Sequence, residues 1–400
     1  MTFLLAMVGL GFAGTVPVQN SAHILEVGEE IDWGVGGAWA RVMIEESGDL
    51  FFYAAGGEFF RMELLEDYTL MEEEKVPLSG RTNLDDHSIQ TCPDGSYLHA
   101  ASGKTVETND SGYMMMYDPS WNRLYSHVLA ENNPEIAYND MPLICHERGR
   151  FVAFIDFDVW GTIVYELDET GLPIREVKIP EIGLAEGGTF LEDPNSGNLA
   201  LVTSNHDNSA IEVNFLDWDL NFLSTKTLFE IDVQVDRNYW PQAVEVIGDR
   251  IVVAYVNQPR KEGRLSDWGD MWLGILDLEW NLIERHAIVT EAAQDGCMRP
   301  GLAYKDGTLI YTYDKILNHP PGDVTPRLVP IALNLEAFGL AEEPVDTGMK
   351  DTQTREDTGQ EDTGQPSEPK GSCACGSTTV MPLASWSWLI LGPLWLRRRR

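Results

Sequence analysis

The sequence predicts an all-β protein with the architecture of a six-bladed β-propeller. Residues 21–340 contain six similar units of about fifty residues. Each unit reads as an apolar strand, a tight turn with glycine, a strongly apolar second strand and two further strands. Helical periodicity is nearly absent. Six equal units of four strands favour a closed ring, because closure removes the free sheet edges that separate meanders would expose.

The first half of each unit is marked by its turn glycine. The six glycines are spaced 47, 54, 48, 51 and 59 residues apart: Gly48, Gly95, Gly149, Gly197, Gly248 and Gly307. The second half of most units has an acidic or polar turn between its third and fourth strands, at Asp118, Asp168, Asp217 and Asp277. Asp, Asn and Gly favour turn geometry at such positions.

The first strand after the N-terminal segment predicts how the ring closes. Ala22–Glu26 is similar to Ser126–Ala130, which reads as the fourth strand of the second unit. No unit precedes Ala22, so this strand is expected to complete the sixth blade by lying beside residues 327–334.

The N-terminus, residues 1–20, is predicted to be a secretory signal peptide. Phe3–Ala13 is apolar and is followed by the small residues Gly14 and Thr15. No Lys or Arg precedes the apolar stretch, and a buried N-terminal strand is the alternative.

Residues 341–370 are predicted to be a disordered, acidic linker, because they contain almost no apolar side chains to bury. The linker repeats the triplet Asp-Thr-Gly, which is also the active-site triplet of aspartic proteases. The triplets recur every five to eleven residues with no strand pattern around them. This spacing argues against a protease.

Residues 371–400 contain a short Cys motif, an apolar segment and an Arg cluster. Cys373 and Cys375 come first, Val380–Leu396 is long enough for a minimal transmembrane helix, and Arg397–Arg400 follows. The tail resembles the MYXO-CTERM sorting signal. That resemblance implies processing near the cysteines by a sortase-like protease and display at the cell surface or outer membrane, tethered through the C-terminus before or after processing. It implies nothing about the activity of the propeller.

The net charge of the chain limits the classes of ligand that it can bind. The formal net charge of −36 argues against nucleic acid as a ligand. It suits a cationic partner, divalent cations or simple solubility.

Cys92 and Cys145 are either a disulfide of an oxidising compartment or small buried residues, and Cys297 is the third cysteine of the propeller.

Two rings of residues upstream of the turn glycines predict a site at one mouth of the central channel. Long loops, Ser102–Gly112, Asn257–Asp270 and Asp314–Pro326, are expected on the same face. The rings are Ala40, His87, Met141, Thr189, Trp240 and Arg299, and, one residue earlier, Trp39, Asp86, Asp140, Gly188, Tyr239 and Met298.

His87, Arg299 and Asp140 are the candidate catalytic residues of this mouth, with Asp86-His87 as a base or metal ligand. The candidate binding residues are Trp39, Asp86, Tyr239 and Trp240. The alternative is that all of these are ordinary polar and aromatic residues at strand starts. Asp156, Asp158 and Asp207 are weak candidates for Ca²⁺, because they follow no known calcium-loop spacing and a solvated loop is the simpler interpretation.

One unit has a more specific pattern. His87–Gln90 followed by Pro93-Asp94-Gly95 loosely resembles the blades of arylsulfotransferase-like and quinoprotein-like propellers. That resemblance suggests an enzyme without naming a substrate. The sequence therefore supports two hypotheses: a surface-displayed binding module for protein or glycan, and an extracytoplasmic transferase, lyase or hydrolase with its site at the channel mouth.

Overall fold

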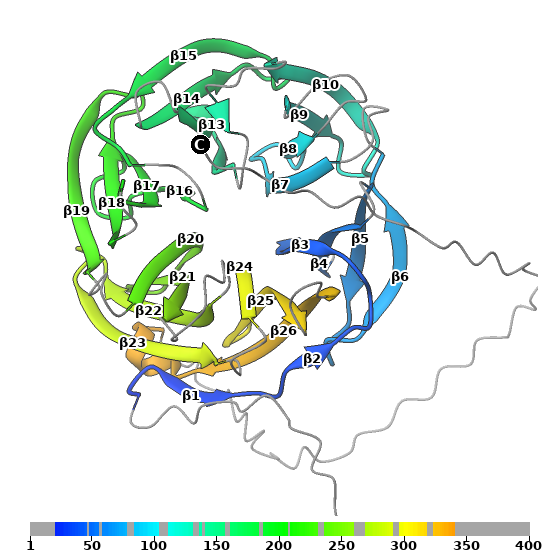
Figure 1. Ribbon diagram of the computed structural model, residues 1–400, viewed down its shortest axis with the longest axis vertical. Coiled ribbons are helices and arrows are strands. Elements are labelled where there is room, and N and C mark those ends of the chain that lie inside the picture. Colours follow the sequence, from blue (N-terminus) through cyan, green and yellow to red (C-terminus); the bar gives the residue numbers. More distant parts are fainter. Residues whose placement is uncertain are drawn as a thin grey trace, which may run out of the picture. The chain divides into compact units, whose positions relative to one another are not determined.

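The computed structural model describes residues 21–45, 48–55, 58–77, 84–103, 111–130, 136–137, 141–156, 161–183, 187–206, 209–230, 236–259, 269–290, 296–317 and 323–340. These residues form six antiparallel sheets around a central axis, which confirms the six-bladed propeller (Figure 1). The predicted signal peptide, linker, Cys motif and transmembrane segment lie outside the described residues.

The first three blades follow the chain from the inner strand to the outer strand. Blade 1 contains β3 (Ala38–Glu45), β4 (Gly48–Ala55), β5 (Glu58–Leu64) and β6 (Leu70–Lys75). Blade 2 contains β7 (Leu84–Thr91), β8 (Tyr97–Gly103), β9 (Ser111–Tyr117) and β10 (Arg123–Ala130). Blade 3 contains β11 (Ile136–Ala137), β12 (Leu143–His146), β13 (Gly149–Asp156), β14 (Gly161–Leu167) and β15 (Pro173–Ile179), and both β11 and β12 pair with β13.

The remaining blades repeat this order, and the last one recruits the N-terminus. Blade 4 contains β16 (Thr189–Glu192), β17 (Leu199–Ser204), β18 (Ala210–Leu216) and β19 (Phe222–Glu230). Blade 5 contains β20 (Asp236–Ile247), β21 (Arg250–Pro259), β22 (Asp270–Asp277) and β23 (Leu282–Val289). Blade 6 contains β24 (Gly296–Lys305), β25 (Thr308–Leu317) and β26 (Asp323–Leu333), and its outer strand comes from β1 (Ile24–Val27) and β2 (Ile31–Asp32).

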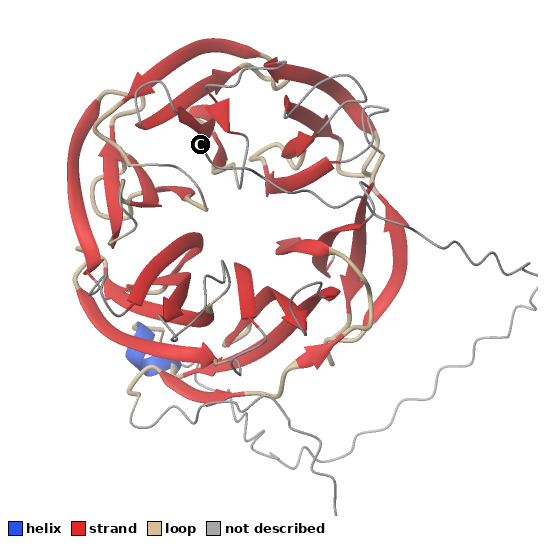
Figure 2. Cartoon of the chain, viewed as in Figure 1, coloured by secondary structure: helices blue, strands red, loops and turns tan. Residues whose placement is uncertain are grey.

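The described chain is almost entirely strand and turn (Figure 2). Its single helical element within those ranges is the 3-10 turn η1 (Leu335–Phe338). None of the described segments forms a helix that is long and apolar enough to cross a bilayer.

The hydrophobic core lies between the blades. Six apolar clusters fill the six interfaces, and each cluster combines side chains of two neighbouring blades. The strands next to the inner ones are apolar on both faces, as in β4 and β17, because both faces pack against a neighbouring blade.

Ring closure follows the sequence prediction. Ile24 of β1 pairs with Leu333 of β26, and Val27 pairs with Ile331. Ile24 is only 4% exposed and packs in the cluster between blades 5 and 6. The N-terminal strand therefore supplies the edge that blade 6 lacks.

Polar contacts connect the three residues before β1 to blade 5. Glu284 of β23 accepts hydrogen bonds from the Ser21 hydroxyl at 2.6 Å and the Ala22 amide at 3.1 Å. His23 Nδ1 lies 2.9 Å from one oxygen of Glu284, and His286 Nε2 lies 2.8 Å from the other. Burial alone would raise the pKa of Glu284, but these hydrogen bonds lower it to about 2.

The acidic turns between third and fourth strands share one geometry. Asp118 accepts hydrogen bonds from the backbone amides of Ser120 and Asn122 through Oδ1. The residue before the asparagine takes a left-handed conformation, with φ 62° at Trp121. The same arrangement recurs at Asp217 with Leu220 and at Asp277 with Trp280. In each case the left-handed residue is apolar and buried against the preceding blade.

The structure corrects one sequence-based boundary. Asp314–Pro326, expected as a long loop, is mostly strand, because β25 runs to Leu317 and β26 begins at Asp323. Asp314 pairs with Pro326 in this ladder. The polar character of the segment is explained by buried ion pairs: Lys315 Nζ lies 3.0 Å from a carboxylate oxygen of Glu30.

Candidate functional site

The inner strands of all six blades enclose a cavity of about 450 Å³ on the propeller axis. This size falls within the range of small-molecule sites. Its walls combine apolar side chains such as Met43, Ile89 and Leu302 with a smaller polar set. The polar lining residues that concern the site are Arg41, Ser88, Gln90, Thr189, Glu245 and Tyr304.

The ring positions predicted from sequence coincide with irregular backbone. The pairing register of the inner strand shifts between Ala38 and Arg41 in blade 1, and between Met298 and Gly301 in blade 6. Similar shifts occur between Leu84 and His87 in blade 2 and around Pro241 in blade 5. β-Bulges of this kind redirect side chains and are common beside functional sites.

Trp39 and Arg299 lie in these irregular segments and contact each other, but neither lines the cavity, so their predicted place at its mouth stays a prediction. The Arg299 guanidinium carbon lies 4.0 Å from the centre of the Trp39 ring, a cation–π contact between blades 6 and 1. Both residues have left-handed backbones, with φ 56° at Trp39 and φ 55° at Arg299. A left-handed non-glycine residue costs on the order of 1–3 kcal/mol, so the surrounding structure must enforce it.

Asp314 of β25 holds the backbone at Trp39 in its left-handed conformation. Its carboxylate accepts the backbone N–H of Trp39 at 2.5 Å and that of Ala40 at 3.1 Å, and it lies 3.3 Å from Arg299 Nη1. Burial raises the pKa of Asp314, while Arg299 and the two amides act in the opposite direction. Sequence reasoning missed this residue because it assigned Asp314 to a loop.

His87 does not face the channel. Its side chain is fully buried between blades 1 and 2, with Nε2 2.7 Å from the Trp39 carbonyl oxygen and the ring 4.4 Å from that of Phe59. Burial, the neighbouring His99 and Arg41 lower its pKa well below the usual value. A neutral, enclosed imidazole stabilises the bulge at Trp39, and this placement does not favour a role as a base that meets substrate.

The remaining candidate site residues are described only by their backbone or lie outside the described residues. Asp86, Tyr239 and Trp240 lie on β7 and β20, where their backbone alone is described, and the same holds for Asp156 at the end of β13. Asp140, Asp158, Asp207, Cys373 and Cys375 lie outside the described residues. Among the described His, Cys, Asp and Glu residues, no group of three or more could hold a metal ion. The Ca²⁺ prediction therefore stays a prediction.

Glu245 of β20 is the functional candidate that the sequence analysis missed. It lines the channel, and within the described part of the chain its carboxyl has no hydrogen-bond or ion-pair partner. The side chain is half-buried, because channel space reaches it, yet burial among the channel walls raises its pKa to about 7. An alternating strand pattern ending at Gly248 gave no sign that this acid faces inward.

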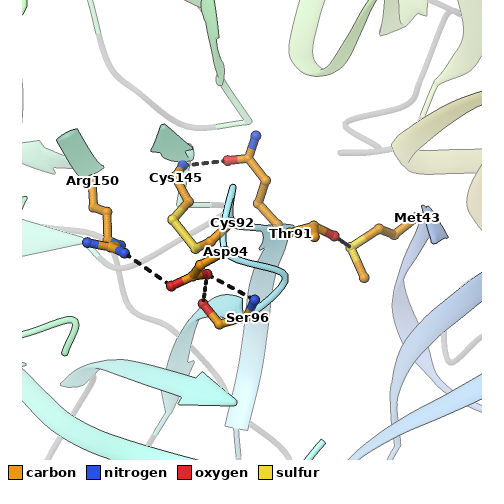
Figure 3. The surroundings of a disulfide bond; sticks show 8 residues. Met43, Thr91, Cys92, Asp94, Ser96, Cys145 and Arg150 are labelled. Atoms are coloured by element: carbon orange, nitrogen blue, oxygen red, sulfur yellow. Dashed lines mark hydrogen bonds and ion pairs between the residues drawn. A yellow bond between two sulfur atoms is a disulfide. The ribbon is translucent and has the colours of Figure 1, made fainter. Parts of the chain in front are cut away.

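A disulfide joins blades 2 and 3 within the apolar cluster between them (Figure 3). Cys92 and Cys145 are bonded with their Cα atoms 5.0 Å apart, which decides between the two alternatives left open by the sequence. Beside it, the Cys145 amide donates to Gln90 Oε1 at 2.9 Å, and Arg150 lies 3.8 Å from Asp94. Cys297 is free and buried.

Comparison with known proteins supports the fold but does not identify a function. No family model and no curated protein sequence matches the chain. Among solved structures, the chain is similar to a protein of unknown function from Dyadobacter fermentans, with 13% identity and a TM-score of 0.57 over 77% of this chain and 99% of that one.

Two further solved structures are similar to a lower degree. An endo-arabinase from Bacteroides thetaiotaomicron has 10% identity and a TM-score of 0.42 over 76% of this chain and 97% of that one. A subtype N11 neuraminidase-like protein (H18N11) has 12% identity and a TM-score of 0.49 over 81% of this chain and 94% of that one. The similarity to the Dyadobacter fermentans protein shows a shared fold, and the ligand is argued from the site.

Proposed function

We propose that this chain is an exported β-propeller that binds a glycan in its central channel. The observation that carries the proposal is a set of uncommitted polar groups around one cavity. Within the described residues, the hydroxyls of Ser88, Thr189 and Tyr304 and the carboxyl of Glu245 have no hydrogen-bond partner. Polar groups in a recess are costly when unpaired, and a hydroxylated ligand would pair them.

The apolar residues of the cavity wall also favour a glycan as the ligand. Sugars present both hydroxyls and C–H faces, and the cavity offers both kinds of partner. A protein ligand, the other possibility for a binding module, would instead need an extended apolar or charged surface at the rim. A cavity of about 450 Å³ on the propeller axis favours a small polar group over such a surface.

The proposal includes export and display at the cell surface or outer membrane. The disulfide between Cys92 and Cys145 supports it, because disulfides persist in oxidising compartments. The Cys motif, apolar segment and Arg cluster of residues 371–400 support a tether and a sortase-like processing protease. Protease treatment of intact cells is expected to remove the propeller, and Cys373→Ala with Cys375→Ala is expected to leave the chain unprocessed.

A glycan array probed with the full-length protein in mild detergent tests the binding function. Binding to a subset of glycans, reduced in channel variants such as Thr189→Val and Ser88→Ala, is the expected result. Glu176→Gln is the matched control, because Glu176 is exposed on outer strand β15. Binding that is lost equally in the control, or that no channel variant changes, would contradict the proposal.

An enzyme remains the second candidate because of one observation. The pKa of Glu245, about 7, lies in the range that suits a general acid or base. Incubation of each bound glycan with the wild-type protein, followed by product analysis, distinguishes the two. Turnover that Glu245→Gln abolishes would make this chain a transferase, lyase or hydrolase acting at the channel.

A further inference from the structure

We propose that the channel receives the end of a sugar chain, inserted along the propeller axis, with Glu245 as the carboxylate that accepts its hydroxyls. This inference rests on the proposed glycan-binding function and adds which part of the glycan is recognised. The topology of the ring, the placement of unpaired groups and the size of the cavity each favour entry by a chain end.

Ring topology limits how a ligand enters. Inner strands of all six blades contribute to the cavity wall, from Arg41 in blade 1 to Tyr304 in blade 6. The β1–β26 ladder closes the ring, and the Cys92–Cys145 disulfide links two of its blades covalently. Apolar clusters fill all six interfaces between the blades, so within the described residues no gap admits a chain from the side. A polymer can reach the cavity only with a free end first.

The unpaired groups lie on separate blades around the axis. Ser88 is on β7 in blade 2, Thr189 on β16 in blade 4 and Glu245 on β20 in blade 5. The Thr189 hydroxyl is buried and has no partner among the described residues. A ring of acceptors and donors that converge from several sides matches a sugar unit with hydroxyls around its circumference. An extended segment lying across a surface would contact one side only.

Glu245 is the strongest acceptor of this set. A carboxylate that has no partner among the described residues, in a cavity whose walls include Met43 and Ile89, loses much of its hydration. Hydroxyl groups of a ligand can replace the lost water, and hydrogen bonds to a charged acceptor are stronger than those between neutral groups. The raised pKa of this carboxyl has the same physical origin.

The cavity volume agrees with a chain end. About 450 Å³ lies towards the lower end of the range for ligand sites, which suits a terminal unit better than a long stretch of polymer. We therefore expect recognition to depend on the number of chain ends and not on the number of sugar units.

Calorimetry with full-length protein tests this expectation. The probes are xylo-, cello-, malto- and arabino-oligosaccharides of two to six units, and the corresponding polysaccharides, together with any glycan that the array identifies. For end-on binding, the Kd expressed per chain end stays constant within about threefold as the chain lengthens. Glu245→Gln is expected to weaken binding by about tenfold or more, and Glu176→Gln by less than twofold. Thermal unfolding of each variant checks that it is folded.

Three outcomes separate the inference from the function beneath it. A Kd constant per chain end, and weakened by Glu245→Gln, supports the inference. A Kd constant per sugar unit, or unchanged binding in folded Glu245→Gln, overturns end-on capture through Glu245 while the glycan-binding function stands. Absence of binding to every probe and array glycan overturns the glycan-binding function, and the inference with it.

Discussion

The carboxyl of Glu245 combines a proposed role in binding with a cost in stability. Its pKa is about 7 in the folded protein and near 4.3 in an unfolded chain. The folded state therefore binds the proton more tightly, and stability is lost as pH rises from about 4.5 through 7. A residue that lowers stability at neutral pH, and that has no partner among the described residues, is better explained by a ligand than by folding.

Replacement of Glu245 by Gln should raise stability at pH 8 and change it little at pH 4. The expected gain at pH 8 is about 1–3 kcal/mol, since each pKa unit corresponds to about 1.4 kcal/mol and channel water moderates the effect. Urea unfolding at both pH values measures it, with Glu176→Gln as the control. An equal change at both pH values would indicate that the Glu245 carboxyl does not titrate differently on folding.

His99 should make the protein sensitive to acid. Burial lowers its pKa to about 3, and its ring lies 5.4 Å from that of His87, whose pKa is also lowered. Both imidazoles are neutral when folded but charged in an unfolded chain below about pH 6.5, so stability is lost as pH falls. His99 alone accounts for about 2 kcal/mol between pH 6.5 and pH 5.

The variant His99→Phe isolates this effect. It should show a shallower fall in urea-unfolding free energy from pH 7 to pH 5 than the wild-type protein, whatever its absolute stability. Its comparison is His206→Phe, because His206 is exposed beyond the end of β17. Identical slopes in all three proteins would contradict the role of His99.

At the residue scale, the sequence predicts which residues are grouped together better than it predicts what each side chain contacts. Alignment on the turn glycines grouped Trp39 with Arg299, and their side chains do contact each other. It could not predict that a bulge encloses His87 between blades, because a bulge changes which side of the strand a residue faces. Asp314 and Glu245 were missed because their partners, or the lack of them, depend on strands distant in sequence.

At the scale of single elements, turn chemistry was the most predictable feature. The Asp118, Asp217 and Asp277 turns have the geometry that their composition indicates, because the aspartate binds backbone amides two and four residues ahead. Strand ends were less predictable. Asp314 and Lys315 read as loop residues, since a charged side chain in a strand is recognisable only when its ion-pair partner is known.

The Cys92–Cys145 disulfide should be a major stabiliser of the joint between blades 2 and 3. It closes a loop of 53 residues, and the restriction of the unfolded chain by such a loop contributes about 2–4 kcal/mol. Cys92→Ser with Cys145→Ser is expected to lower the thermal midpoint by several degrees. Reductant should lower the midpoint of the wild-type protein to a similar extent and should not affect the double variant. A wild-type midpoint that is insensitive to complete reduction would contradict this role.

At the scale of the whole molecule, the repeat determines the architecture. Six units predicted six blades, and one pattern match between Ala22–Glu26 and Ser126–Ala130 predicted the closing strand. The ligand was not predictable in this way, because a propeller positions loops and inner strands without fixing what they bind. The channel chemistry differs from blade to blade, and only the assembled ring shows which side chains share the cavity.

The closing strand should control the stability of the entire ring, and two neighbouring residues provide the test. Ile24 is 4% exposed and packs between blades 5 and 6, whereas Leu25 on the same strand is 69% exposed. Ile24→Ala should destabilise the protein by about 2–4 kcal/mol through lost burial and the resulting cavity, and Leu25→Ala by less than about 0.5 kcal/mol. Because every blade packs on two neighbours, the Ile24→Ala protein should still unfold in one transition, at a lower urea concentration. A separate early transition, with most of the strand signal retained, would mean that blade 6 opens independently and that β1 secures only its own blade.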